Sequence, residues 1–417
     1  LEWCPFAARW FKMEFPLHQR PHGRGQGSDM FLEDFDFAKL ISPYTPAQFF
    51  EEYWEKAPLL IKRENPAYYA GLLEPKDLDE VLFHWPNDLS TVHSERNDGH
   101  RKILGSNIKQ RQVQTVLQEI DDGHSLIFNA LDQRYPPLTE LCALLEREHG
   151  WLYQTNIYLS PRQSQGFRAH SEDHNVFVMQ TTGRKNWRVN KTPVKPSVQI
   201  DPDRQVPIDE SNYTEFVLEQ GDLVYIPKGF GHDARASSEP SVHITLSPHP
   251  PVWRKVLAAA MKRMVDEEPW LEQSLPAQFA NGSSEELAAE IARGFERLVR
   301  SNHDDAANSV IEQAHDAFRG LFLGALARRM GDGEVCLQQK FVRNRLLNVR
   351  EEFSDDICRV RTPRKTVDLP ILFRPQVEFC LSGQVFCGSD IPGMSAGEQK
   401  VLLDRLLAEG LLVESSD

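Results

Sequence analysis

Two histidines and a carboxylate are spaced in this sequence so that they can share a metal ion. His170 and Glu172 lie two positions apart in QGFRAHSEDHNVFVMQ, at the head of an apolar run. Because side chains alternate along a strand, a strand here would turn both toward one face. A further candidate, His232, follows the Gly-rich segment GDLVYIPKGFG about sixty residues later. Two histidines and a carboxylate on one face leave coordination positions open, as in non-haem Fe(II) oxygenases.

Lys185 supports this interpretation. It lies fifteen residues after His170, and Gly183 marks a turn between them, so a hairpin can return the lysine beneath the metal. A dicarboxylate such as 2-oxoglutarate needs a cation of this kind for its distal carboxylate. The alternative is that His170, Glu172 and Lys185 are ordinary exposed polar residues.

Short apolar or alternating segments surround these residues and predict a β-rich domain. Turns containing Gly, Pro and Asp separate the segments, which is typical of a β-barrel or sandwich. A cupin-type double-stranded β-helix is one such architecture. The expected strands are WLYQTNIYLS, VFVMQ, NWRV, EFVLEQGDLVYIP and SVHITLS.

Helices are expected before these strands. Thr45, Pro46 and Gln48 suit the N-cap, N1 and N3 positions of a capping box, and Pro58 ends that helix before the short strand LLI. Residues 1–29 are expected to be an expression-derived or natural extension without its own fold, or a short amphipathic segment that packs on the first domain. Further helices are predicted at 75–84, 108–120 and 137–148.

The pattern becomes helical again after the strands, with apolar residues at helical spacing in 253–265, 284–300 and 305–330. This segment is expected to be a linker or an oligomerisation surface. The C-terminal part then predicts a hairpin in VEFCLSGQVFC, a helix capped by Ser395 and Glu398, and a final strand LLVE. A helix followed by such strands is typical of a winged helix.

Composition describes an ordinary globular protein, with 40% apolar and 26% charged residues among 417, which is enough chain for two or three domains. The net charge of −14 argues against a nucleic-acid binder and suits a basic partner or simple solubility. Residues 340–365 are locally basic, with eight Lys or Arg against four Asp or Glu. A structural or protein-binding role for that run is favoured over nucleic-acid contact.

Six scattered cysteines without a CxxC pair favour reduced thiols. The sequence has no apolar run long enough to span a membrane and no clear signal-peptide core. A cytoplasmic location without membrane contact is therefore predicted.

The segments QGFRAHSEDHNVFVMQTTGRKNWRV and GDLVYIPKGFGHDA resemble the JmjC ribosomal-oxygenase family, also called cupin-4 proteins. FFEEYWEKAPLLI resembles the N-terminal signature of that family, and SVHITLS resembles its late barrel strand. The resemblance covers roughly residues 30–250 by motif and the remainder by domain layout. It implies an Fe(II)- and 2-oxoglutarate-dependent protein hydroxylase, which forms succinate and CO₂ as it hydroxylates a C–H bond.

The resemblance implies that His170, Glu172 and His232 are the metal ligands. The family usually has His-x-Asp, whereas this chain has Glu172, one methylene longer. Glu172 can still ligate iron if its backbone sits slightly further back; a weakened or shifted metal site is the other outcome. Asn175 stands where the family often has Asp.

By the same resemblance, Lys185 matches the basic residue that pairs with the distal carboxylate of 2-oxoglutarate. Asn156 and Ser247 match family positions near this cosubstrate, although a polar residue on a barrel strand is often only a core hydrogen-bonding group. The resemblance implies no catalytic side chain beyond these metal and cosubstrate ligands.

The predicted protein is of the α+β class. It has an extension (1–29), a JmjC/cupin double-stranded β-helix barrel with N-terminal helices (30–252), a helical dimerisation module (253–332) and a C-terminal winged-helix-like domain (333–417). The predicted function is hydroxylation of an Arg or His side chain of a basic ribosomal protein by a homodimer. Alternatives are hydroxylation of another peptide or small molecule, and a non-catalytic binding scaffold with a degenerate metal site.

Overall fold

The structure is a computed structural model that describes residues 32, 35–84, 89–92, 101–105, 113–194, 206–267, 272–274, 283–300, 304–322, 324–330 and 334–415. The extension predicted for residues 1–29 and the first part of the helix predicted at 108–120 lie outside these residues. In the described segments, no helix combines the length and apolar character needed to cross a membrane.

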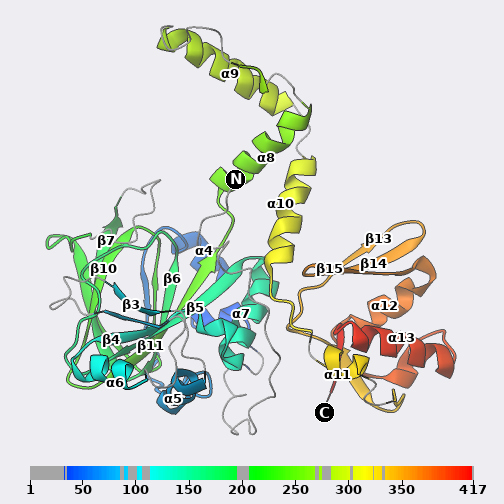
Figure 1. Ribbon diagram of the computed structural model, residues 1–417, viewed down its shortest axis with the longest axis horizontal. Helices are drawn as coiled ribbons and strands as arrows, with labels where there is room; N and C mark the ends of the chain where they lie inside the picture. Colours follow the sequence, from blue (N-terminus) through cyan, green and yellow to red (C-terminus); the bar gives the residue numbers. More distant parts are fainter. Residues whose placement is uncertain are drawn as a thin grey trace.

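Two antiparallel sheets form the first half of the chain (Figure 1). The larger sheet has the order β1-β9-β6-β11-β5-β4-β2-β3, and the smaller has the order β10-β7-β8. The strands are β1 (Leu59–Ile61), β2 (Leu89–Val92), β3 (Arg101–Gly105), β4 (Ser125–Phe128), β5 (Leu152–Ser160), β6 (Val176–Thr182), β7 (Arg184–Pro193), β8 (Tyr213–Glu219), β9 (Leu223–Ile226), β10 (Phe230–Ala236) and β11 (Ser241–His249).

An apolar layer packs the two sheets face to face. Val178 and Val224 of the larger sheet share a buried cluster with Trp187, Leu218 and Phe230 of the smaller sheet. Each strand alternates between this interior and the outer face, as strand geometry requires. The α+β class and the double-stranded barrel predicted from the sequence are confirmed.

Helices cover the outer face of the larger sheet. They are α3 (Phe37–Ile41), α4 (Pro46–Glu52), α5 (Pro75–His84), α6 (Val113–Asp121) and α7 (Pro136–His149), with the short 3₁₀ turn η2 (Leu131–Gln133). The predicted capping box of α4 is present, because Thr45 and Gln48 bond reciprocally. Phe49 of α4 is fully buried and packs its ring against Tyr225 of β9, with ring centroids 4.9 Å apart. The aromatic face of α4 is therefore part of the core.

Three helices leave the barrel after β11 and project away from it (Figure 1): α8 (Trp253–Glu267), α9 (Ser284–Arg300) and α10 (Asp304–Ala317). The continuous helix expected at 305–330 is wrong, because α10 ends at Ala317 and a separate short helix, α11 (Ala325–Arg329), follows. Gly324, immediately before α11, has a φ of +76°, which a helix cannot contain.

The C-terminal part is a small α+β unit with its own core. Its elements are β12 (Lys340–Arg343), β13 (Arg350–Phe353), β14 (Ile357–Thr362), β15 (Lys365–Pro370), η5 (Ile371–Phe373), α12 (Arg374–Cys380), β16 (Phe386–Cys387), η6 (Gly388–Asp390), α13 (Ala396–Ala408) and β17 (Leu412–Glu414). The predicted cap of α13 by Ser395 and Glu398 is present, and Gly410 follows the helix with a φ of +70°.

The hairpin expected in VEFCLSGQVFC is wrong, because the first half of this segment is helix α12. A proline lies in the first turn, where its fixed φ favours a helix. Val377 and Cys380, three positions apart, are fully buried on one helix face. Helical spacing therefore outweighs the β-forming residue types of this segment.

Candidate functional site

The loop that carries the first two candidate ligands is not a regular strand, in contrast to the expectation. His170 makes an isolated bridge to His232, and β6 begins only at Val176. Two backbone bonds join the pair, from His170 N to His232 O at 3.0 Å and from His232 N to His170 O at 2.8 Å. Gly229 N also donates to Glu172 O at 2.8 Å. Backbone pairing with the start of β10 therefore brings the three predicted ligands together.

The two imidazoles are oriented so that the same nitrogen of each remains available. Nδ1 of His170 lies 2.9 Å from Arg168 O, and Nδ1 of His232 lies 3.0 Å from Phe230 O. A hydrogen bond from Nδ1–H to a carbonyl leaves Nε2 as the metal-binding atom and fixes the ring. The two ring centroids are 4.6 Å apart. This donor set suits a divalent transition metal such as Fe(II).

The Glu172 side chain contacts His170 and is also partly exposed to solvent. Its Oε1 lies 3.5 Å from Nε2 of His170. In the described part of the chain, no group of three or more His, Cys, Asp or Glu side chains is already arranged to hold a metal ion. Metal binding at these residues therefore requires the Glu172 side chain to exchange its contact with His170 for the metal.

The charge states suit such an exchange. Burial alone would raise the pKa of Glu172, but the neighbouring His170 and His174 lower it well below its usual range. Burial and the proximity of His170 lower the pKa of His232 to about 4. Burial opposes protonation of His170 as well, yet the Glu172 carboxylate raises its pKa above the ordinary value. An ionised carboxylate and a neutral imidazole are thus both ready to ligate.

Lys185 lies deeper between the sheets. It pairs with Ala236 in the ladder that pairs His232 with Val189, so four positions of β10 separate the two ends of the site. Four strand residues span about 13 Å. The Lys185 side chain is buried, and its Nζ donates to Ser160 Oγ at 2.8 Å. Within the described residues it forms no ion pair, and burial lowers its pKa to about 7.

Asn156 and Ser247 both point into the barrel. Asn156 of β5 pairs with Thr245 of β11, and Ser247 pairs with Gln154 two positions along the same ladder. The Asn156 Oδ1 accepts from Ala130 N at 2.9 Å and from Gln154 Nε2 at 3.2 Å, so its amide NH₂ is the group left to donate. Ser247 is buried.

The sequence interpretation missed two ring side chains on the same interior face. His243 stacks on Tyr158 with ring centroids 4.9 Å apart and an angle of 6° between planes. The same His243 lies edge-on to Trp187, at 5.7 Å between centroids. His243 lies four positions before Ser247, and this even spacing along one strand was the signal that could have identified it.

Several interior polar atoms have no internal partner. Among the described residues, Nδ1 of His243 and the indole N–H of Trp187 are buried without a hydrogen-bond partner. Burial and the proximity of Lys185 lower the pKa of His243 well below its ordinary value. Unsatisfied buried polar groups are costly, so native proteins retain them mainly where a ligand or water completes them. We call the interior set the barrel cluster; it consists of Asn156, Tyr158, His170, Glu172, Lys185, Trp187, His232, His243 and Ser247.

Comparison with known proteins places this barrel among characterised folds. Residues 130–256 match the family model described as JmjC domain. Ribosomal oxygenase 1 of Rattus norvegicus is 31% identical over 258 residues, which cover 58% of this chain and 42% of the relative. Ribosomal oxygenase 2 of Rattus norvegicus is 32% identical over 222 residues, 51% of this chain and 46% of the relative. The chain thus spans less than half the length of these curated relatives.

Solved structures share the fold. An X-ray structure of Escherichia coli YcfD superposes with a TM-score of 0.53 at 19% identity, covering 89% of this chain and 98% of that protein. A structure of the same Escherichia coli ribosomal oxygenase in complex with cobalt and 2-oxoglutarate superposes with a TM-score of 0.51 at 18% identity, covering 90% and 99%.

Proposed function

Residues 130–256 match the JmjC domain model, and from this match and the geometry we propose that the protein is an Fe(II)- and 2-oxoglutarate-dependent oxygenase that hydroxylates a protein side chain. One observation carries the proposal. Two imidazoles whose Nδ1 atoms bond backbone carbonyls and an ionised carboxylate gather at one end of the interior. A buried lysine without a carboxylate partner among the described residues lies at the other end. A metal and a dicarboxylate would supply both missing partners.

Each residue has a specific part in this proposal. His170, Glu172 and His232 would hold the metal, which when bound would supply the activation of O₂, with 2-oxoglutarate as the co-reductant. Lys185 would bind the distal carboxylate of 2-oxoglutarate, with Asn156 and Ser247 donating hydrogen bonds beside it. Because Lys185 is buried, a bound carboxylate would interact with it in a low-dielectric environment, where the attraction is strong. We assign no catalytic side chain beyond these metal and cosubstrate ligands.

The proposed substrate is a basic protein, with an Arg or His of a ribosomal protein as the target. The matched relatives are named ribosomal oxygenases, and a Drosophila yakuba relative at 29% identity is named a bifunctional lysine-specific demethylase and histidyl-hydroxylase. The net charge of −14 favours encounter with a positively charged protein through long-range attraction. The predicted cytoplasmic location remains a proposal.

Turnover tests this function directly. We expect the purified protein with Fe(II) to convert 2-oxoglutarate to succinate and to add 16 daltons to a ribosomal protein in a matched cell extract. His170→Ala and Glu172→Ala should abolish both, whereas Asp173→Ala, an exposed neighbour, should retain them. If neither product forms with wild-type protein, and cobalt binding is unaffected by the first two variants, the barrel is a binding scaffold instead.

We also propose that the protein is a homodimer. Leu287, Ile291 and Phe295 repeat every four residues along α9, and their side chains are 41%, 52% and 53% exposed. Helix α9 projects from the rest of the chain (Figure 1), so nothing else in the described structure covers this stripe. A helix with such a stripe is stabilised mainly by packing, and a second copy of the same helices offers a complementary apolar face.

Light scattering after size-exclusion chromatography tests the dimer. Phe295→Glu places a charge in the apolar stripe and should shift the mass from two chains to one. Arg293→Glu, on the opposite face of α9, is the matched control and should remain dimeric. A wild-type monomer, or a Phe295→Glu dimer, would contradict the proposed interface.

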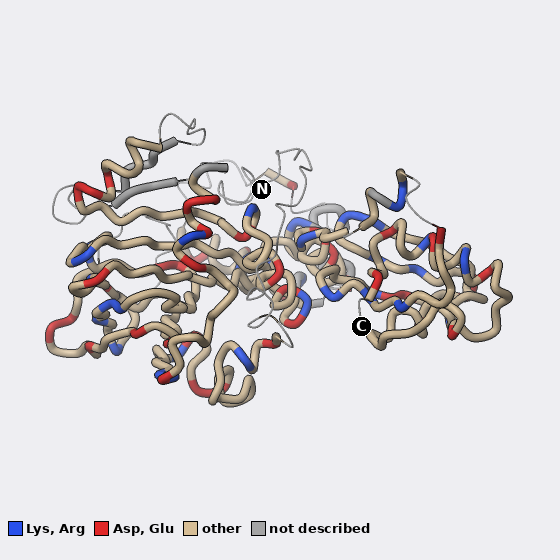
Figure 2. The backbone as a smooth tube through the Cα atoms, turned by 90° about the horizontal axis from the view of Figure 1, so that it is seen from below, with Lys and Arg blue, Asp and Glu red and all other residues tan. Residues whose placement is uncertain are grey.

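We propose that the C-terminal unit does not contact nucleic acid, because arginines of its basic run at 340–365 are paired with carboxylates. Arg359 pairs with Asp368 at 2.8 Å, and Arg361 pairs with Glu312 at 2.8 Å. Lys and Arg are interspersed with Asp and Glu in the C-terminal unit (Figure 2). A nucleic-acid footprint needs unpaired positive charge along one face, and intramolecular carboxylates reduce it here.

A further inference from the structure

On the side opposite β11, strand β5 lacks a strand neighbour beside Thr155. Its partner β4 ends at Phe128, which pairs with Ile157. Two positions beyond this end, Thr155 N donates to Oδ1 of Asp132 at 2.7 Å. Asp132 N donates in return to Thr155 Oγ1 at 3.1 Å. A side-chain carboxylate thus takes the place of the missing strand carbonyl.

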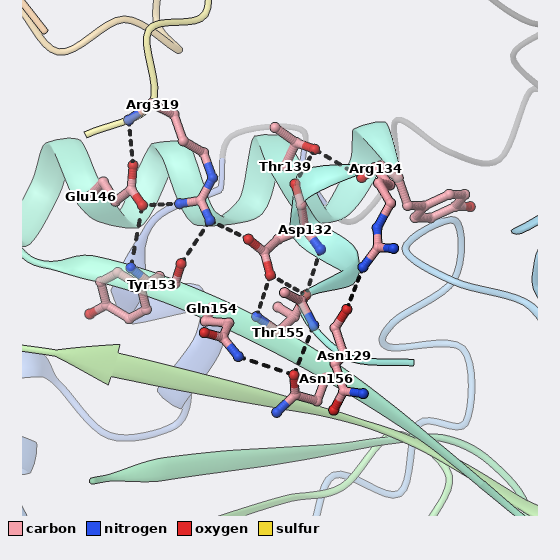
Figure 3. Close-up of polar contacts among 12 residues, drawn as sticks. Asn129, Asp132, Arg134, Thr139, Glu146, Tyr153, Gln154, Thr155, Asn156 and Arg319 are labelled. Atoms are coloured by element: carbon pink, nitrogen blue, oxygen red, sulfur yellow. Dashed lines mark hydrogen bonds and ion pairs between the residues drawn. The ribbon is translucent and has the colours of Figure 1, made fainter. Parts of the chain in front are cut away.

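The same carboxylate binds an arginine from a distant part of the chain. Asp132 is completely buried, and its Oδ2 accepts from Nη2 of Arg319 (Figure 3). Arg319 follows α10, beyond the helices that project from the barrel. Its guanidinium also donates to Glu146 Oε1 and to Tyr153 O, the latter at 2.8 Å. We call Asp132, Glu146, Tyr153, Thr155 and Arg319 the outer cluster.

Arg319 provides the only cation within this cluster. Asp132 is 0% and Glu146 is 2% exposed, so without the guanidinium two carboxylates would be buried next to each other without a counter-ion. Removing one partner of a buried pair is far more damaging than replacing the pair as a whole. The acceptors all belong to the barrel, whereas the donor lies outside the barrel boundary predicted at 252. The barrel domain therefore binds a residue of the predicted helical module, located just after α10.

The outer cluster reaches the interior of the barrel through one short turn. Ala130 and Asp132 belong to the same turn, in which Ala130 has left-handed backbone angles (φ 46°, ψ 49°). Asp132 binds Thr155 on the outer face of β5, while Ala130 N donates to Oδ1 of Asn156 on the inner face. The position of this turn therefore fixes Oδ1 of Asn156, and the amide NH₂ is directed into the barrel.

We propose that Arg319 is a positioning residue for 2-oxoglutarate: through Asp132 and the turn at 130–132, it orients the Asn156 amide toward the cosubstrate. The inference rests on the proposed function, since it assigns a support to the cosubstrate end of that site. It also predicts an asymmetry. His232 belongs to β10, on the other sheet, and the backbone of His170 and Glu172 is bonded to His232 and Gly229. The loss of Arg319 should therefore affect the cosubstrate and leave the metal in place.

The test compares the two affinities in the full-length protein. In Arg319→Gln, we expect the Kd for 2-oxoglutarate, measured with cobalt present, to rise about tenfold, as is usual when a supporting residue is lost. The Kd for cobalt alone should change less than twofold. Arg319→Lys keeps the positive charge but loses the planar guanidinium with its several donors, so the Kd for 2-oxoglutarate should rise by an intermediate amount. Arg328→Gln, which breaks an ion pair with Asp404, is the matched control and should change neither affinity.

A double-mutant comparison separates positioning from general loosening. If Arg319 acts through Asn156, then Arg319→Gln should weaken 2-oxoglutarate binding no further in an Asn156→Ala background. Asp132→Asn keeps an acceptor for Thr155 and weakens the arginine link, so it provides a second variant if Arg319→Gln does not fold. It should reproduce the tenfold loss.

The contrary results are distinct. Equal losses of cobalt and 2-oxoglutarate affinity, or additive effects in the Asn156→Ala background, would overturn the positioning role and leave a purely structural one. Unchanged 2-oxoglutarate binding in Arg319→Gln would overturn it as well. If the wild-type protein binds cobalt but no 2-oxoglutarate, both the inference and the proposed function fail.

Discussion

The barrel cluster and the outer cluster lie on opposite faces of the same strand, β5, and they differ in how completely their polar groups are satisfied. In the outer cluster, both carboxylates accept bonds from Arg319 and from backbone N–H groups. In the barrel cluster, Lys185 has no carboxylate partner among the described residues, and His243 Nδ1 is unbonded. Lys185 and His243 are buried almost as fully as Asp132 and Glu146, so burial alone does not distinguish a binding site from a structural pair.

This difference in hydrogen-bond and ion-pair satisfaction indicates the role of each cluster. A saturated ionic network contributes to one defined arrangement of the chain and has no capacity left for a ligand. An incomplete one is unfavourable in the free protein and is completed only when a ligand binds. Substitutions in the outer cluster should therefore reduce stability, and affinity for 2-oxoglutarate only indirectly through Asn156. Substitutions in the barrel cluster should reduce affinity without reducing stability, and the following predictions test that division.

The largest effect is expected from Asp132→Ala. The change leaves the Thr155 N–H unbonded and the buried Arg319 with one carboxylate fewer, which costs about 3–5 kcal/mol of unfolding free energy. Urea unfolding measures this loss. Asp404→Ala breaks the Arg328 pair, whose aspartate is 61% exposed, and should cost less than about 1 kcal/mol. Similar losses in the two variants would show that the outer cluster has no special role in stability.

Lys185→Met should have the opposite pattern of effects, with no loss of stability and a large loss of affinity for 2-oxoglutarate. It removes a buried ammonium that has no counter-ion in the free protein, so the unfolding free energy should stay the same or rise. Affinity for 2-oxoglutarate should fall about a hundredfold, because a buried charge-assisted pair is lost. Isothermal titration calorimetry with cobalt present measures the affinity. Lys191→Met, an exposed change on the same strand, is the control; a marked loss of stability in Lys185→Met would contradict the division.

The pH dependence of cosubstrate binding follows from the same lysine. With its pKa lowered to about 7, Lys185 is cationic below pH 7 and becomes neutral above it. A bound carboxylate favours the charged form and raises this pKa, so binding takes up a proton above pH 7. Affinity for 2-oxoglutarate should therefore weaken by up to about tenfold per pH unit between pH 7 and 9.

Calorimetry in buffers of different ionisation enthalpy measures this proton uptake. Lys185→Met should abolish it. Affinity that stays constant between pH 7 and 9 in the wild-type protein would mean that Lys185 keeps its charge without a ligand.

The sequence predicts the division only in part. His170, Glu172 and Lys185 are recognisable because their spacing is local, and His232 is recognisable because it follows a Gly-rich turn. The barrel strands are predictable for the same reason, since alternation is a local pattern. Arg319 is not recognisable: its partners Asp132 and Glu146 lie more than 170 positions away, and nothing in the surrounding sequence distinguishes it from an exposed arginine. Contacts set by the packing of distant segments leave no periodic signal.

The smallest effect is expected from Glu172→Asp, which restores the residue type implied by the family resemblance. The loop that carries Glu172 is held by backbone bonds to Gly229 and His232 and not by the glutamate side chain, so the loop should keep its position. The shorter carboxylate then starts about 1.5 Å further from the metal. We expect cobalt affinity to fall only a fewfold, because a side chain that is 35% exposed has room to adjust.

Cobalt titration followed by visible absorption measures this change, with Asp173→Asn as the control for a nearby lost charge. A loss above a hundredfold would mean that the loop is built for the length of glutamate. A gain in cobalt affinity would mean that Glu172 weakens the metal site, because its side chain contacts His170 in the free protein. A fewfold loss would instead show that backbone pairing sets the position of the metal ligands, so that this end of the barrel cluster depends less on side-chain support than the cosubstrate end.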